Sequence, residues 1–220
     1  MEEIFPGVFR KGKRIFTENL RPGQKVYGED LLREGGKEYR EWVPYRSKLA
    51  AAILKGLKIF PFKKGTTILY LGASTGTTVS HLSDIVGKEG VIYAVEFSER
   101  MMRELLDLCE KRPNIIPILA DARKPKEYDW VGEVDVVYED LAQPDQTRIL
   151  IKNAEMFLKP GGEFLIAIKA RSVDVTEDPK KIYRESKDEL SERFEVIQLI
   201  ELEPYEKDHC IILGRFRASP

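Results

Sequence analysis

The chain has 220 residues, 42% of them hydrophobic, enough for one domain or for a core domain with a small appendage. Its 36 basic and 37 acidic side chains give a net charge of −1, so any grip on nucleic acid would depend partly on partners. No apolar run approaches the roughly 18–20 residues of a membrane span, and two distant cysteines indicate neither a disulfide framework nor a metal site.

The first 46 residues have the pattern of a small antiparallel β-sheet. Short runs that contain β-branched and aromatic residues alternate with turns that contain glycine. We predict that residues 1–46 form a small β-rich N-terminal domain and that residues 47–220 form a second domain. The predicted strands pair as 7–10 with 14–17 across the turn 11–13, and as 25–27 with 39–42 across the turn 34–36.

Strand and helix signals alternate from residue 47 onward, beginning with an alanine-rich helix from Lys48 to Gly56. Short apolar strands separated by helices of about 10–15 residues indicate a parallel sheet with helices on both faces. The last two strand-like runs have no helix between them and should pair antiparallel. We therefore predict an α/β, Rossmann-like fold with a mostly parallel seven-stranded sheet, an antiparallel terminal hairpin and the β-rich appendage. The predicted strands are 67–71, 91–95, 115–119, 134–138, 163–169, 194–200 and 210–216, and the predicted helices are 77–86, 98–111, 145–157 and 179–192.

Residues 67–98 carry the clearest ligand-binding pattern. A strand ends in the loop from Gly72 to Gly76, and a helix then begins, whose first N–H groups are unpaired. Glu96 ends the next strand, and its two carboxylate oxygens match the vicinal hydroxyls of a ribose. The sequence therefore predicts a site for an adenosine-containing cofactor.

The loop spells G-x-x-x-G, which is neither the dinucleotide fingerprint nor a phosphate-binding P-loop. Acidic residues end two neighbouring strands, Glu96 and Asp121, and a terminal hairpin is not usual in dehydrogenases. These features favour an S-adenosylmethionine-dependent methyltransferase over a nicotinamide enzyme. Asp121 could accept from the adenine amine, and Phe97 could lie against the adenine ring. The predicted cofactor-binding residues are Gly72, Gly76, Thr77, Thr78, Glu96, Phe97, Asp121, Ala122, Asp140, Leu141, Ala142 and Gln143.

Four polar residues are candidates for the chemistry, and each also has an ordinary structural interpretation. Lys169 ends an apolar strand and could reach water by its long side chain. Asp140 could cap the following helix, and Lys48 could be a solvated residue of a first helical turn. His209 precedes the last strand and, taken alone, resembles a surface histidine. No His, Cys or Asp cluster has metal-ligand spacing, so we predict no metal.

Six blocks of sequence, taken together and in order, resemble the fibrillarin family over essentially the whole chain. In lacking a glycine/arginine-rich N-terminal tail, the sequence resembles the archaeal members of the family. The first residues lack the apolar run of a signal peptide, which argues against export, so we expect a cytoplasmic location. The blocks are EYREWVPYRSKLAAAI (38–53), YLGASTGTT (70–78), AVEFS (94–98), ADARKP (120–125), YEDLAQP (138–144) and AIKARSVDVT (167–176).

The resemblance implies a class I methyltransferase that moves a methyl group from S-adenosylmethionine to ribose 2′-hydroxyls of rRNA and tRNA. It implies work inside a ribonucleoprotein that contains a box C/D guide RNA, a Nop-domain scaffold protein and a kink-turn-binding protein, with no membrane. Such partners agree with the near-neutral charge. Two alternatives stay open: a methyltransferase that acts on protein glutamine, and a non-catalytic scaffold of the ribonucleoprotein.

The family's catalytic set of Lys, Asp, Lys and His maps onto Lys48, Asp140, Lys169 and His209. We expect Lys169 to be the base, Lys48 to be the cation that lowers its pKa and steers the phosphate, and Asp140 to orient Lys169. His209 would hold the acceptor or complete the hydrogen-bond network. The competing assignment makes Asp140 the base, assisted by both lysines. Small departures from the family pattern remove no polar group: Ser74, Val79 and Leu141.

Overall fold

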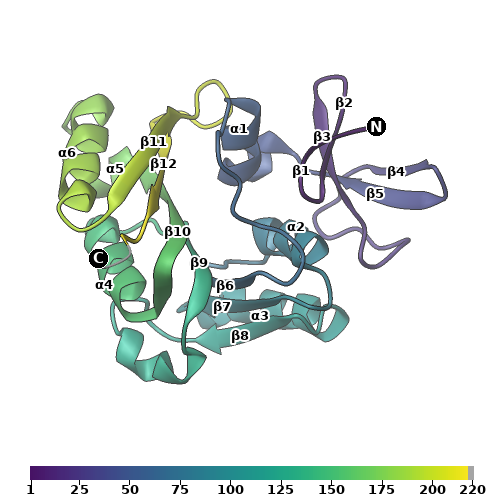
Figure 1. Cartoon of the computed structure of the whole chain (residues 1–220), viewed down its shortest axis with the longest axis horizontal. Coiled ribbons are helices and arrows are strands. Elements are labelled where there is room, and N and C mark those ends of the chain that lie inside the picture. Colours follow the sequence, from purple (N-terminus) through teal and green to yellow (C-terminus); the bar gives the residue numbers. More distant parts are fainter. Residues whose placement is uncertain (218–220) are drawn as a thin grey trace.

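Residues 1–217 are described by a computed structural model, in which the chain forms two β-sheets (Figure 1). The N-terminal sheet has five strands in the order β1-β2-β3-β5-β4. The predicted hairpin across residues 11–13 is confirmed, because β2 and β3 pair antiparallel there. Its strands are β1 (Glu2–Phe5), β2 (Val8–Lys11), β3 (Arg14–Glu18), β4 (Leu31–Glu34) and β5 (Lys37–Glu41).

The strand predicted at 25–27 is wrong, and β4 takes its place beside β5. The carboxylate of Glu29 explains the difference, because it accepts hydrogen bonds from the backbone N–H groups of Val26 at 3.0 Å and Tyr27 at 2.8 Å. Those N–H groups are therefore not free to join a β-ladder. The first strand, β1, was not predicted either.

The second sheet has seven strands in the order β11-β12-β10-β9-β6-β7-β8. Strands β6 to β10 run parallel, whereas β12 is antiparallel to both of its neighbours, as predicted for the terminal hairpin. The predicted α/β fold class is therefore confirmed. The strands are β6 (Thr67–Leu71), β7 (Val91–Glu96), β8 (Ile115–Leu119), β9 (Val134–Glu139), β10 (Leu158–Lys169), β11 (Glu195–Glu201) and β12 (His209–Arg215).

The four long helices lie where the sequence predicts them, and so does the alanine-rich helix that precedes β6. Three shorter elements were not predicted, namely η1, η2 and α5. The helices are α1 (Lys48–Leu54), α2 (Thr77–Val86), α3 (Glu99–Lys111), α4 (Gln146–Phe157), α5 (Ala170–Val173) and α6 (Pro179–Ser191), with the 3₁₀ helices η1 (Pro44–Arg46) and η2 (Pro125–Val131).

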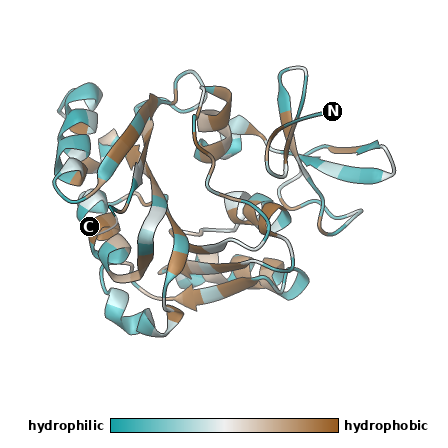
Figure 2. Cartoon of the chain, in the orientation of Figure 1, coloured by the Kyte–Doolittle hydropathy of each residue, from teal (hydrophilic) through white to brown (hydrophobic). Residues whose placement is uncertain are grey.

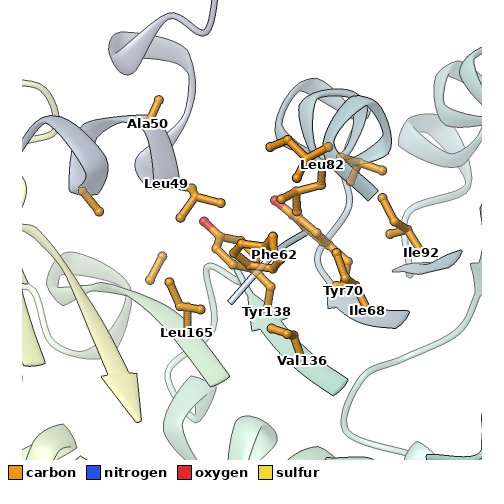
Figure 3. Packing of buried hydrophobic residues seen from close by; sticks show 14 of the residues in the cluster. Leu49, Ala50, Phe62, Ile68, Tyr70, Leu82, Ile92, Val136, Tyr138 and Leu165 are labelled. Atoms are coloured by element: carbon orange, nitrogen blue, oxygen red, sulfur yellow. The ribbon is translucent and has the colours of Figure 1, made fainter. Parts of the chain in front are cut away.

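Helices cover both faces of the seven-stranded sheet. One apolar cluster joins the sheet to α1, α2 and α3, and a second joins it to α4 and α6. Figure 3 shows the centre of the first cluster, where Phe62, Tyr70 and Tyr138 lie beneath Leu49 of α1. Each fully buried side chain of this size contributes about 1.5–3 kcal/mol. Hydrophobic residues accordingly line the sheet and the inner sides of the helices, whereas the outer side of α6 is hydrophilic (Figure 2).

The order of the strands fixes where a ligand can enter. Strand β6 lies between β7 and β9, so the connections that leave β6 and β9 run toward opposite sides of the sheet. At such a switch point the loops diverge and leave a crevice at the carboxyl ends of the strands. Both the glycine loop after β6 and Asp140 after β9 lie at this edge.

A buried polar network joins the N-terminal sheet to α2. Arg40 of β5 is fully buried and donates to Glu29 at 2.6 Å and to Asp84 of α2 at 2.8 Å. Asp84 also accepts from Arg112 at 2.6 Å, and Trp42 stacks on His81 of α2. The N-terminal sheet thus packs against the helix that follows the glycine loop (Figure 1).

The division into domains at residue 46 stays a prediction, which the presence of one sheet on each side of it supports. The network described above means that the two sheets share a buried boundary. Within residues 1–217, no helix combines the length and the apolar character that crossing a membrane requires.

Candidate active site

Two adjoining pockets lie at the carboxyl ends of the parallel strands. The central pocket, between α1 and the loops after β6 and β9, has a volume of about 400 Å³. The edge pocket, between the loops after β6, β7, β8 and β9, has a volume of about 310 Å³. The residues that line both pockets are Gly72, Ser74, Asp140, Leu141 and Ala142.

The glycines of the loop are required by the protein's own packing. At Gly72, where φ is +83°, a Cβ atom would lie 2.4 Å from the carbonyl oxygen of Asp140 and 2.7 Å from the Leu141 side chain. At Gly76, where φ is +90°, a Cβ atom would lie 2.4 Å from Leu108 of α3. Gly72 therefore allows the two loops to approach each other. Gly76 allows α2 to begin against α3, and it lines neither pocket.

Glu96 lies at the floor of the edge pocket and is only 6% exposed. Its two oxygens accept backbone N–H groups from Ser74 and Ser98, each at 2.8 Å. These bonds hold the carboxylate against the glycine loop and leave each oxygen a further lone pair. The neighbouring Phe97 is 63% exposed and lines the same pocket, so its ring is accessible to a ligand.

Asp121 follows β8 on the other side of the edge pocket. Arg123, which the sequence reasoning missed, joins this loop to the loop after β9. Its guanidinium donates to both oxygens of Asp145 at 3.0 and 2.7 Å and to Gln143 at 2.8 Å. The position of Arg123, two residues after Asp121 at the end of a strand, was the signal in the sequence that could have identified it. The neighbouring guanidinium of Arg123 lowers the pKa of Asp145.

An ion pair between Lys48 and Asp140 lies in the central pocket. The ammonium nitrogen of Lys48 is 2.9 Å from one carboxylate oxygen of Asp140, and about a fifth of each side chain is exposed. Burial alone would lower the pKa of Lys48, but the charge and hydrogen bond of Asp140, together with the charge of Glu206, outweigh burial and raise it. Lys48 is therefore a stable cation at neutral pH.

Local structure fixes the position of Lys48. Ser47 accepts from the backbone N–H of Ala50 and so caps α1, which begins at Lys48. The Ser47 hydroxyl also bonds the hydroxyl of Thr78 on α2 at 2.9 Å. The start of α1 is thereby held against the start of α2, on the side where Asp140 lies.

His209 and Lys169 face each other across two paired strands, because Lys169 ends β10 opposite His209 at the start of β12. The ring Nδ1 of His209 lies 2.6 Å from the carbonyl oxygen of Lys207. A carbonyl oxygen can only accept, so Nδ1 carries the hydrogen and Nε2 is left as an acceptor. Burial, reinforced by the charge of Lys48, lowers the pKa of His209, so the ring is neutral at pH 7.

The four residues of the predicted catalytic set all line the central pocket. Asp140 pairs with Lys48, and among residues 1–217 it forms no ion pair with Lys169. The predicted orienting contact from Asp140 to Lys169 is therefore not present, and both residues' roles stay predictions.

Apart from Gly76, the predicted cofactor-binding residues line one or both pockets. Six residues of the central pocket are absent from the predicted sets, three of them inside the glycine loop: Arg46, Tyr70, Ala73, Ser74, Thr75 and Glu206. The position of Arg46 two residues before Lys48 was the one signal that could have found it. Glu206 comes from the β11–β12 connection, more than a hundred residues after Thr78 and the earlier residues that line the same pocket.

Comparisons with known proteins agree along the whole chain. The fibrillarin family model matches residues 1–218. The chain is 58% identical to a fibrillarin-like rRNA/tRNA 2′-O-methyltransferase of Thermococcus sibiricus over 217 residues, covering 96% of each protein. The structure of Aeropyrum pernix fibrillarin with natively bound S-adenosyl-L-methionine matches with a TM-score of 0.85 and 52% identity, over 91% of this chain and 88% of that one. A chain of a fibrillarin/Nop5p complex matches with a TM-score of 0.89 and 44% identity, over 98% of this chain and 100% of that one.

Proposed function

The chain belongs to the fibrillarin family, and we propose that it methylates ribose 2′-hydroxyls of rRNA and tRNA with S-adenosylmethionine as the donor. The observation that carries this proposal is the arrangement of the two pockets. One contains the Lys48–Asp140 ion pair with Lys169 and His209, and the other contains acidic residues at two strand ends. The first suits proton transfer and the second suits a nucleoside.

The residues of the edge pocket fit the adenosine part of the cofactor. Glu96 keeps a free lone pair on each oxygen, as two ribose hydroxyls require, and the exposed Phe97 ring offers a surface for the base. Asp121 would accept from the adenine amine. The relative from Aeropyrum pernix, which has S-adenosyl-L-methionine natively bound, supports the same cofactor here. Thr77 and Thr78 line the central pocket, where the methionine part would lie.

The bound cofactor supplies a methyl group that is already activated on a sulfonium. The residues of the central pocket then have to align the ribose 2′-oxygen and accept its proton. The carbon–sulfur bond breaks as the carbon–oxygen bond forms, and the hydroxyl proton passes to a base of the pocket. Alignment of this kind can contribute up to roughly 7–11 kcal/mol.

Lys48 is the fixed cation of the central pocket, because its ammonium is paired with Asp140 and its pKa is raised. A protonated Lys48 cannot accept the proton of the ribose hydroxyl, so the base is another residue of the central pocket. Lys169 and Asp140 are the two candidates, and the neutral Nε2 of His209 would accept a hydrogen bond from the acceptor ribose.

We further propose that the chain acts as the catalytic subunit of a ribonucleoprotein. The relative solved as a fibrillarin/Nop5p complex supports a Nop-domain scaffold as partner. A box C/D guide RNA would select the target by base pairing, and a kink-turn-binding protein would bind that guide. This division of labour fits a chain with a net charge of −1. A cytoplasmic location and the division into domains 1–46 and 47–220 belong to the same proposal.

The test is methylation by a complex assembled from the chain, the scaffold, the kink-turn-binding protein and a guide RNA, with labelled cofactor. We expect one methyl group at the guided nucleotide, and a moved site when the guide is changed. Lys169→Met should abolish methylation and keep cofactor binding, whereas Lys152→Met, on the exposed face of α4, should change neither methylation nor cofactor binding. Label in protein glutamine, or no transfer by the wild-type complex, would refute the proposal.

A further inference from the structure

Two exposed side chains lie in the short turn that precedes the proposed catalytic Lys48. Tyr45 and Arg46 belong to η1, and both are exposed, Tyr45 by 61%. Arg46 lines the central pocket. It also lines a neighbouring pocket of about 400 Å³ that extends beneath the N-terminal domain toward Lys25 and Lys111.

Arg46 shares its two pockets with the carboxylates of Glu104, Asp107, Asp140 and Glu206 but forms an ion pair with none of these four. Among residues 1–217 it forms no ion pair, unlike Arg40 and Arg123 near the same site. Its recorded side-chain contact is with the ring of Tyr27, 5.7 Å from the guanidinium carbon. A guanidinium that lies on an aromatic ring is oriented and still has its donors available for an anion.

Tyr45 is held in place although it is exposed. Its ring packs edge-on against Tyr205, with centroids 5.2 Å apart. Tyr205 lies in the β11–β12 connection, four residues before His209, and this connection runs beside α1 (Figure 1). The Tyr45 ring is therefore anchored to the connection that leads into His209.

The backbone beneath both side chains is fixed. Pro44 begins η1, and Ser47 ends it while capping α1 and bonding Thr78. Proline fixes one backbone dihedral, and the cap fixes the next turn. Tyr45 stays 61% exposed despite its contact with Tyr205, and the Arg46 guanidinium forms no ion pair among residues 1–217, so packing within the described chain leaves both side chains largely unused. They are suited to a partner that is both anionic and able to pack against a ring.

We propose that Arg46 and Tyr45 form a rim that binds the RNA backbone next to the target nucleotide, an inference that rests on the proposed function. Arg46 binds a phosphate through its planar fork of donors, and the Tyr45 ring packs against the neighbouring ribose. In a guide–target duplex of A form, the 2′-hydroxyls line a wide, shallow minor groove. A shallow rim reaches them without opening base pairs. Because it contacts no base edges, it acts equally on every guided sequence.

The test compares Arg46→Ala with Arg184→Ala in the assembled complex. Arg184 is an exposed arginine of α6 that, among residues 1–217, also lacks an ion pair. We expect Arg46→Ala to raise the target-RNA concentration for half-maximal rate about tenfold, as the loss of one charge-assisted hydrogen bond requires. The slope of log affinity against log salt should fall by about 1. Cofactor affinity and the behaviour of Arg184→Ala should match the wild type.

Tyr45 is tested by Tyr45→Ala and Tyr45→Phe, with Trp130→Ala as the control for an equally exposed aromatic residue (59%). We expect the alanine variant to bind target RNA more weakly and the phenylalanine variant to keep the affinity, because the ring makes the contact. Thermal unfolding of each variant verifies folding.

Three outcomes overturn the inference. They are an unchanged salt slope in Arg46→Ala, a defect confined to certain guided sequences, or weaker retention by the scaffold protein with normal methylation once assembled. The last would make the rim a protein interface. If the wild-type complex binds the duplex and Arg46→Ala weakens that binding, but no methyl group is transferred, the proposed function fails and the rim stands.

Discussion

Asp84→Asn should strongly destabilise the protein, because Asp84 is the centre of the network between the two sheets. Its side chain has no exposed area, and it accepts four hydrogen bonds. One oxygen takes Arg40 at 2.8 Å and Thr17 at 2.9 Å, and the other takes Arg112 at 2.6 Å and the Leu20 N–H at 2.9 Å. An asparagine must put its NH₂ group against one of these pairs of donors.

The magnitude follows from the loss of a buried charge between two buried arginines. Arg40 keeps Glu29 as a partner, but Arg112 has no second carboxylate among the described residues. Breaking a buried ion pair on one side costs about 3–5 kcal/mol. At about 2–4 °C per kcal/mol for a chain of this size, the melting temperature should fall by about 6–20 °C.

Denaturant unfolding and thermal melts measure this change, with Asp107→Asn as the control. Asp107 is an exposed residue of α3 without an ion pair among residues 1–217, so its variant should stay within about 0.5 kcal/mol of the wild type. A loss below about 1 kcal/mol for Asp84→Asn would refute the reasoning, since desolvation of the charges would then offset their attraction.

Three further changes test other parts of the structure. Gly72→Ala should cost about 1–3 kcal/mol of stability from its positive φ and should weaken cofactor binding, because the new Cβ lies 2.4 Å from the Asp140 carbonyl; wild-type affinity by calorimetric titration would contradict this. Arg123→Ala should weaken cofactor binding by about twofold to fivefold, a range discounted for solvent screening, and leave kcat unchanged; a change in kcat alone would contradict its place beside the edge pocket. Burial, together with the charges of nearby arginines, holds the pKa of His81 well below its ordinary value. Below about pH 6.5 only the unfolded chain therefore binds a proton at this residue. The free energy of unfolding then falls by about 1.4 kcal/mol for each unit by which the pH is lowered. Unfolding measured from pH 7 to 5 should give a flatter curve for His81→Gln than for the wild type, and parallel curves would count against the reasoning.

Local patterns were sufficient for the second domain and insufficient for parts of the first. The alternation of short apolar strands with helices between residues 67 and 192 predicted each long element, because helices pack on both faces of the sheet and its strands are therefore mostly apolar. Residues 25–27 looked like a strand, but a side chain three residues away, Glu29, bonds their N–H groups. Such competition between side chain and ladder is not visible in a hydrophobic pattern.

The site shows the same limit at longer range. The sequence predicted which strand ends would gather, since parallel strands end at one edge, and these ends do line the two pockets. It could not predict that Asp140 pairs with Lys48, ninety-two residues away, rather than with Lys169. Gly76 was expected to contact the cofactor, but its missing side chain makes room for Leu108. Which residues pair or pack together at the site depends on where the helices lie, and tertiary packing sets those positions.

The place of β12 ties the pocket to the end of the chain. This strand inserts between β10 and β11, and its first residue, His209, lies opposite Lys169. A chain that stops before residue 209 lacks the strand that joins β10 to β11, and it lacks one of the residues that line the central pocket. The central pocket is therefore complete only in a chain that extends past His209 and has paired β12 with β10.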